Sequence, residues 1–238
     1  RLRAFNGQPI LTRSDKEICF VPAMTGKQSF EQKYETKIFL TGEVQTRASN
    51  WHDFFNALVW LVFPRAKSTL NQLHYEMQNL EAERQLVHRS VLRDAATLFD
   101  ESGVVVVSTK QALIELMKNF QWKELFWQRR EEVLSSMRFW VFGHGLYEKA
   151  LHPYTGMTGK GIAFHVDTTF FQDSETSQLQ AIDLMLQSFL SRDLSSSADL
   201  MPIPLLGYPG WVEANNDETY YDNKRYFRDK NKPNCSAA

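Results

Sequence analysis

Two stretches combine apolar bulk with side chains that could do chemistry. Residues 50–74 read NWHDFFNALVWLVFPRAKSTLNQLH, and the second stretch reads FGHGLYEKAL around His144. Residues four apart on a helix point the same way, so His144 and Glu148 have a spacing that suits two metal ligands, or a base and the carboxylate that orients it. His52 and Asn56 share a helix face by the same rule. These residue types indicate metal binding or acid–base chemistry.

We predict a buried polar site where the two stretches meet. The predicted catalytic groups are His52, Asp53, His144 and Glu148. The metal ligands among them are His52, His144 and Glu148, and Asp53 is expected to orient a histidine. The predicted ligand-binding residues are Asn56, Arg65, Asn71, His74, Arg93 and Asp94. The expected cofactor is a divalent metal ion, the expected ligand is a small anion held by Arg65 or Arg93, and the reaction hypothesis is hydrolysis.

The same residues also have a purely structural interpretation. A buried polar group left unpaired costs about 1–3 kcal/mol, so a satisfied hydrogen-bond network that fixes helix register would use the same faces. Neither pair alone matches a catalytic signature. His52-Asp53 lacks the upstream histidine of histidine–aspartate phosphohydrolases, and no HExxH motif occurs. Both interpretations stay open at this point.

Three further motifs are weaker candidates for a functional site. GMTGKG, residues 156–161, looks like a phosphate loop, but Tyr154 stands at the position of the first glycine, so a turn entering a strand is expected. Asp100-Glu101 could bind a cation through paired carboxylates, but a solvated hairpin tip is favoured there. The C-terminal aromatic and basic residues could stack on single-stranded nucleic acid. Interspersed acidic residues favour an arm that packs on its own domain.

The first stretch must form helices that hold these side chains. Asn50 is a good N-cap, Asp53 can complete a capping exchange, and the apolar residues that follow keep helical spacing. Pro64 ends this helix and can start a second one. Residues 139–147 are apolar on every side, and we predict a buried helix there. The polar face of the Trp51 helix is then expected to meet that of the Phe139 helix.

The remaining elements are predicted from turn residues and periodicity. Residues 1–49 are expected to form loops and short strands, including a hairpin of 37–40 with 43–46 about Thr41-Gly42. Residues 95–108 are predicted to be a buried β-hairpin. Helices are predicted at 75–88, from Ser108 or Thr109 to about 119, within 122–151 and at 177–191, and a strand at 160–166. Residues 200–211 favour an extended strap, and 213–238 a polar tail.

Composition excludes several classes of protein. Hydrophobic residues make up 43% of the 238 residues and aromatic residues 13%, which excludes a disordered chain. The net charge of −1 gives no global field for nucleic acid or an anionic membrane. No apolar run approaches the length that spans a bilayer. Cys19 and Cys235 have no metal or redox spacing, so a cytoplasmic location is expected; the start at Arg1 suggests a trimmed N-terminus.

Four blocks together resemble a known family. These are TGEVQTRASNWHDFFNALVWLVFPRAKSTLNQLH, RDAATLFDESGVVV, FGHGLYEKAL and PLLGYPGW. They resemble a bacterial family described only as domain of unknown function 3025, over residues from about Tyr34 to Arg228. The resemblance implies a bacterial, cytoplasmic, single-domain protein and no activity, cofactor or partner.

We therefore predict one α+β domain over residues 1–238, mainly helical, with two buried central helices and a small sheet that includes the hairpin. The favoured function is a metal or small-molecule site, with hydrolysis as the reaction class. The alternative is a non-catalytic interaction protein that grips a protein partner with the strap around Tyr208 and Trp211 or with the tail. Nucleic-acid binding ranks third.

Overall fold

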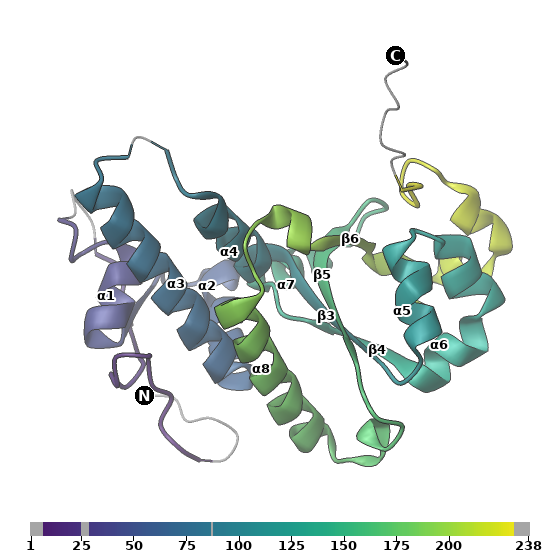
Figure 1. The fold of residues 1–238 in the computed structure, drawn as a ribbon, viewed down its shortest axis with the longest axis horizontal. Helices are drawn as coiled ribbons and strands as arrows, with labels where there is room; N and C mark the ends of the chain where they lie inside the picture. The colour runs from purple at the N-terminus through teal and green to yellow at the C-terminus, as the bar shows by residue number, and fades with distance from the viewer. Residues whose placement is uncertain (1–6, 25–28, 87, 231–238) are drawn as a thin grey trace.

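A mixed four-stranded sheet forms the middle of the molecule. The computed structural model describes residues 7–24, 29–86 and 88–230. The strand order is β4 (Met137–Val141), β3 (Gly103–Ser108), β5 (Thr158–His165) and β6 (Met201–Pro204). β3 pairs antiparallel with β4 and parallel with β5, and β5 pairs antiparallel with β6 (Figure 1). The predicted α+β class is confirmed.

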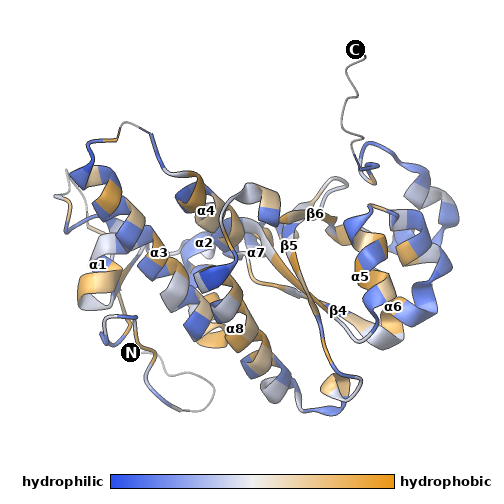
Figure 2. Ribbon diagram, in the orientation of Figure 1, coloured by the Kyte–Doolittle hydropathy of each residue, from blue (hydrophilic) through white to orange (hydrophobic). Residues whose placement is uncertain are grey.

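Each face of the sheet has its own hydrophobic core, because successive side chains of a strand point to opposite faces. Val105 and Val107 face α2 (Trp51–Val62), α3 (Pro64–Glu83), α4 (Val91–Ser102) and α8 (Glu175–Arg192). Val104 and Val106 face α5 (Gln111–Lys118), α6 (Arg130–Ser136) and the C-terminal segment. Figure 2 shows hydrophobic residues concentrated along the strands and in the helices beside them.

Helices α2 and α3 confirm the predicted helices of residues 50–74, but α2 is not buried on every side, because Trp51 and Phe54 are 58% and 50% exposed. The Asn50 side chain accepts a hydrogen bond from the backbone N–H of Asp53 at 3.0 Å, and α2 begins at Trp51. Pro64 occupies the first position of α3, where its missing N–H costs nothing. The short junction at Phe63 fixes the two helices relative to each other. His52 and Lys67 are thereby carried on adjacent rigid elements.

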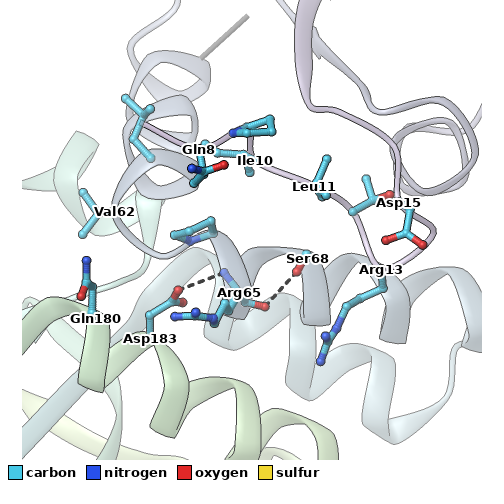
Figure 3. Close-up of a pocket in the computed structure, with 14 residues that line it drawn as sticks. Gln8, Ile10, Leu11, Arg13, Asp15, Val62, Arg65, Ser68, Gln180 and Asp183 are labelled. Atoms are coloured by element: carbon cyan, nitrogen blue, oxygen red, sulfur yellow. Dashed lines mark hydrogen bonds between the residues drawn. The ribbon is translucent and has the colours of Figure 1, made fainter. Parts of the chain in front are cut away.

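Asp183 of α8 supplies the missing cap of α3. Its carboxylate accepts hydrogen bonds from the backbone N–H groups of Arg65 at 3.0 Å and Ala66 at 2.9 Å, which have no partner within the helix. Figure 3 shows Asp183 pointing from α8 to this first turn, at the wall of a cavity of about 460 Å³. Burial raises the pKa of the Asp183 carboxyl to about 6, and the two N–H groups oppose the shift only in part.

Replacing Asp183 by asparagine is expected to change how stability depends on pH. The folded pKa of about 6 exceeds the ordinary 3.8, so the group's contribution to stability is complete below pH 3.8 and is lost as the pH rises through 6. The wild type should therefore lose roughly 1–3 kcal/mol relative to Asp183→Asn between pH 4 and pH 7. Urea unfolding at both pH values measures this. A wild type that gains on the variant as the pH rises would contradict the raised pKa.

The N-terminal region differs from the prediction. Residues 37–40 belong to helix α1 (Tyr34–Thr41), so the hairpin about Thr41-Gly42 is wrong. Gly42, with φ 76°, ends this helix in the left-handed conformation that glycine adopts without strain. β2 (Glu43–Thr46) pairs in parallel with β1 (Cys19–Pro22) instead. Helix α1 packs on α3 and contributes Tyr34 to the site described below.

Two predicted elements near the site are also wrong. Residues 95–108 are not a hairpin, because α4 runs to Ser102 and β3 follows directly. Ser90 caps α4, and Ala95, Ala96 and Phe99 bury one helical face. Residues 139–141 are not helical, because they pair with β3 as part of β4. The helix of this stretch is α7 (His144–Ala150).

The other elements largely follow the prediction. The strand at 160–166 and the helix at 177–191 are confirmed as β5 and α8, and α5 confirms the helix ending near 119. The region 122–151 contains a π-helix (Glu124–Gln128) and α6 before β4. Short 3-10 turns occupy Phe170–Gln172, Ser197–Asp199, Leu205–Gly207, Glu213–Asn216 and Glu218–Asp222.

The predicted polar tail is packed against the core over its described part. Tyr221 and Phe227 are about 1% exposed, and the Tyr221 hydroxyl donates to the Gly207 carbonyl at 3.0 Å. Residues 231–238 lie outside the described residues. Within the described ranges, every helix falls short of the length and apolar character needed to cross a membrane.

Candidate metal centre

Three potential metal-ligand atoms converge from three helices. They are Nε2 of His52 in α2, Oε1 of Glu101 in the last turn of α4, and Nε2 of His144 at the start of α7. The two histidine nitrogens are 3.0 Å apart, and Glu101 Oε1 lies 3.6 Å from His52 Nε2 and 3.5 Å from His144 Nε2. His144 is buried, whereas His52 and Glu101 are partly exposed. One side of the group therefore faces solvent.

These separations match what a small tetrahedral metal ion requires. Bonds of about 2.0–2.1 Å at tetrahedral angles place ligand atoms about 3.3–3.4 Å apart, and the three separations lie around that value. Two imidazoles and one carboxylate form the ligand set of a zinc site with one position left for water or substrate. The residues present thus fit a divalent transition metal, with zinc as the best match.

The far nitrogen of His52 has a carboxylate partner. Its Nδ1 lies 3.0 Å from Glu148 Oε2, so a proton on Nδ1 is donated to Glu148 and Nε2 presents a lone pair. Glu148 is thus placed to orient His52, and Glu101 holds the third-ligand position that the sequence assigned to Glu148. The predicted i, i+4 relation between His144 and Glu148 holds, because both lie in α7.

The far nitrogen of His144 faces a buried ion pair. Nδ1 of His144 is buried, has no hydrogen-bond partner among the described residues, and lies 3.9 Å from Asp100 Oδ2. Asp100 Oδ1 is bound to the Lys67 ammonium at 2.6 Å. Burial by itself raises the pKa of the Asp100 carboxyl, but Lys67, His144 and His74 outweigh it and the net shift is downward. Asp100 is therefore a carboxylate held beside the second histidine ring.

Two glycines let α7 approach α4 closely enough to bring His144 to Glu101. A Cβ on Gly143 would lie 2.5 Å from backbone atoms of Ser102, and a Cβ on Gly145 would lie 2.7 Å from Glu101 Oε2. Any larger residue would push the two helix ends apart. Hydrogen bonding by His144 also lowers the pKa of the Glu101 carboxyl, against the effect of burial.

A cavity of about 300 Å³ adjoins the three ligand atoms. Charges of both signs line it. Three arginines, Arg47, Arg89 and Arg93, pair with the carboxylates of Asp53, Asp94 and Glu81 respectively, and the lining also includes the carboxylates of Glu35, Asp53, Asp100 and Glu101. His74 and Asn56 line it too, and Asn56 donates to the Tyr34 hydroxyl at 2.9 Å. Burial, reinforced by the charge of Glu35, raises the pKa of Tyr34 well above its ordinary value, so this phenol stays neutral.

The structure separates the other predicted residues. Asp53 accepts hydrogen bonds from Arg47 rather than from a histidine, and Arg47 lowers the pKa of Asp53. Asn71 donates to Glu35, away from the ligand atoms. Arg65 lines the cavity next to Asp183, and Asp94 pairs with Arg89 at the surface. Arg65, Asn71 and Asp94 are therefore not part of the candidate centre.

Sequence analysis missed Lys67, and it named Asp100-Glu101 as a possible cation site but favoured a solvated hairpin tip, whereas both residues lie in α4. Ser90 as an N-cap, followed by apolar residues at positions 92, 95, 96 and 99, is a helix signal that would have placed Asp100 and Glu101 on one helical turn. Lys67 gave no signal, because an isolated lysine in a helix is normally solvated.

The fold and the geometry of the site define the class of protein: an α+β protein with a candidate metal centre of two histidines and one glutamate. A family model described as Protein of unknown function (DUF3025) matches residues 18–231, and the chain belongs to that family. Neither the curated proteins nor the solved structures contain a match.

Proposed function

We propose that this protein binds one divalent metal ion, with zinc as the best fit, and hydrolyses a small anionic substrate. His52, Glu101 and His144 are the ligands. The proposal includes the bacterial cytoplasmic setting that the sequence predicts, a reducing compartment that suits the free thiol of Cys19.

The single observation that carries the proposal is the convergence of three ligand atoms within 3.0–3.6 Å. It is supported by the carboxylate behind His52, where Glu148 Oε2 lies 3.0 Å from Nδ1, whereas Asp100 lies 3.9 Å from Nδ1 of His144 and makes no hydrogen bond with it. Metal-binding histidines usually have such partners, which fix the ring orientation and raise the basicity of the ligating nitrogen.

Hydrolysis is supported by the open side of the centre and the adjoining cavity. A bound zinc ion supplies Lewis-acid chemistry and lowers the pKa of a coordinated water. Arg47 and Arg93 line the cavity and are suited to orient an anionic substrate beside it. Glu148 is exposed and its Oε2 lies 3.0 Å from Nδ1 of His52, so it is the residue suited to accept a proton.

Zinc titration of chelator-treated protein tests the binding step. Isothermal titration calorimetry is expected to show one equivalent bound to the wild type and to the His165→Ala control, whose exposed ring lies outside the centre. The His144→Ala variant should lose this site. Zinc-dependent hydrolysis of p-nitrophenyl phosphate by the wild type, absent in His144→Ala, tests the reaction. A wild type that takes up no zinc would sink the proposal.

Glu148→Gln is expected to weaken zinc binding by about 10–100-fold without removing the site, because it weakens the group that orients His52. The exposed Glu131→Gln serves as the matched control and should bind zinc like the wild type. Competition against a fluorescent zinc chelator measures both affinities. Equal affinities for the two variants would show that Glu148 has no orienting role.

Exposed apolar side chains favour the interaction hypothesis, and they lie partly at the predicted strap and mainly elsewhere. Tyr208 is buried and its hydroxyl donates to the Met137 carbonyl. Trp211 of the strap is 39% exposed, and a larger exposed apolar group lies on α2, where Trp51, Phe54 and Leu58 are 58%, 50% and 39% exposed. If the wild type binds no zinc, the histidine network is structural and this face of α2 becomes the leading functional surface.

A further inference from the structure

A second cavity, of about 550 Å³, lies away from the candidate metal centre, where β5 and β6 meet the C-terminal segment. This volume suits one small-molecule ligand. Its wall combines cations with aromatic rings, contributed by Lys160, Arg225, Arg228, Phe120, Trp122 and Tyr226. Lys160 belongs to GMTGKG, the segment that sequence analysis assigned to a turn entering a strand, and β5 begins at Thr158 as expected.

The three cations have no carboxylate of their own. Among the described residues, Lys160, Arg225 and Arg228 make no ion pair within 4.0 Å. Asp229 also lines the cavity, but its carboxylate is bound to the Lys224 ammonium at 2.7 Å. The cavity therefore has an excess of positive charge that an anionic ligand would neutralise.

The aromatic wall is held in an unusual conformation. Phe120 follows the C-terminus of α5 with φ 59°, in the left-handed region that glycine normally occupies at this position. Its ring lies 5.4 Å from that of Trp122, whose indole N–H donates to the Arg228 carbonyl at 3.0 Å. A bulky residue in such a backbone conformation is a mark of functional sites. The bond from Trp122 also ties the rings to the cationic segment.

The edge strand beside the cavity excludes a peptide that would bind as an added β-strand. β6 is the last strand of the sheet, and it carries Pro202 and Pro204 opposite Lys160 and Thr158. Proline has no N–H, so this edge cannot pair with an added peptide strand. A compact ligand that uses side chains rather than backbone hydrogen bonds fits the site better.

We propose that this cavity binds a small anion carrying a planar ring, the chemistry of a nucleoside phosphate. Arg225, Arg228 and Lys160 contact the phosphate, since guanidinium groups form paired hydrogen bonds with phosphate oxygens. The ring stacks on Phe120, as bases stack on aromatic side chains in single-stranded nucleic-acid sites. The site is independent of the metal centre.

Calorimetric titration of the full chain with AMP, in the presence of EDTA, tests the proposal apart from any metal site. One equivalent of AMP is expected to bind, and Arg225→Ala and Arg228→Ala should each weaken it at least about 10-fold. Lys110→Ala, which removes an exposed cation that pairs with Glu132 outside the cavity, should stay within about 2-fold of the wild type.

The ring contact is tested with Phe120→Gly, which suits the backbone conformation and removes only the aromatic wall. It should weaken AMP at least about 10-fold and leave inorganic phosphate unaffected. No saturable AMP binding, equal affinities for AMP and phosphate, or arginine variants that bind like the wild type would each overturn the proposal. Tighter binding of a single-stranded oligonucleotide than of AMP would overturn it in favour of a nucleic-acid surface.

Discussion

Lys67→Met is expected to lower the free energy of unfolding by about 3–5 kcal/mol, because it leaves the Asp100 carboxylate without its cation inside the protein. The side chains of Lys67 and Asp100 are 5% and 14% exposed and their charged atoms are 2.6 Å apart. The Lys67 ammonium also lies 5.5 Å from the centre of the Trp60 ring. Urea unfolding of the wild type and the variant measures the loss.

A double variant and a surface control distinguish the loss of the buried ion pair from a general effect of removing a lysine. Lys67→Met with Asp100→Leu should recover much of the stability, because no unpaired charge then remains buried. Lys224→Met breaks the exposed pair with Asp229, whose side chains are 66% and 74% exposed, and should cost at most about 1 kcal/mol. If Lys67→Met costs no more than Lys224→Met, the buried ion pair does not stabilise the protein.

Glu101→Ala is expected to weaken zinc binding at least about 100-fold, because it removes one of three ligands rather than a group behind them. His144→Ala should do the same, and the double variant should bind little worse than either single variant, since the ligands act as one unit. Competition with a zinc chelator measures these affinities.

Asp94→Ala is the matched control for Glu101→Ala. Both carboxylates lie on α4, but Asp94 pairs with Arg89 at the surface, away from the ligand atoms. Its removal should leave zinc affinity within about 2-fold of the wild type. If Asp94→Ala and Glu101→Ala reduce zinc affinity equally, the carboxylates of α4 act only through their negative charge and Glu101 is not a ligand.

Sequence analysis identified both histidines of the candidate centre, and the reason was physical. His52 and His144 stand out because each is a polar residue in a strongly apolar setting that needs a partner. The expectation that the Trp51 helix meets the stretch around His144 is correct, and α2 packs on α7. Residues 139–141 were wrongly predicted to be helical, but this error does not affect the expectation. His144 and Glu148 lie in a helix both in the prediction and in the structure.

Glu101 was named as a possible cation ligand but assigned to a solvated hairpin tip, because its local sequence favours two conformations. Asp-Glu-Ser-Gly is rich in turn-forming residues, which favoured a hairpin, yet the apolar spacing before it continues a helix to Ser102. Burial of Phe99 against Phe142 decides between them, with ring centres 4.9 Å apart. That contact joins residues 43 positions apart in the chain, so local propensity carries no information about it.

Strand pairing was the least predictable part of the fold. β2 lies between helices α1 and α2, and it pairs in parallel with β1, which precedes α1 in the chain. β3 likewise pairs with β4 and β5, which follow it after several intervening helices. The alternation of apolar and polar residues along a strand indicates which face of that strand is buried. It does not indicate which other strand pairs with it.

The most direct test of the metal centre is a crystal of the wild-type protein grown with zinc chloride, with data collected on both sides of the zinc absorption edge. The account predicts an anomalous peak about 2.0–2.1 Å from Nε2 of His52, Nε2 of His144 and a carboxylate oxygen of Glu101. Zinc bound elsewhere, with the two histidine nitrogens still in mutual contact, would contradict it.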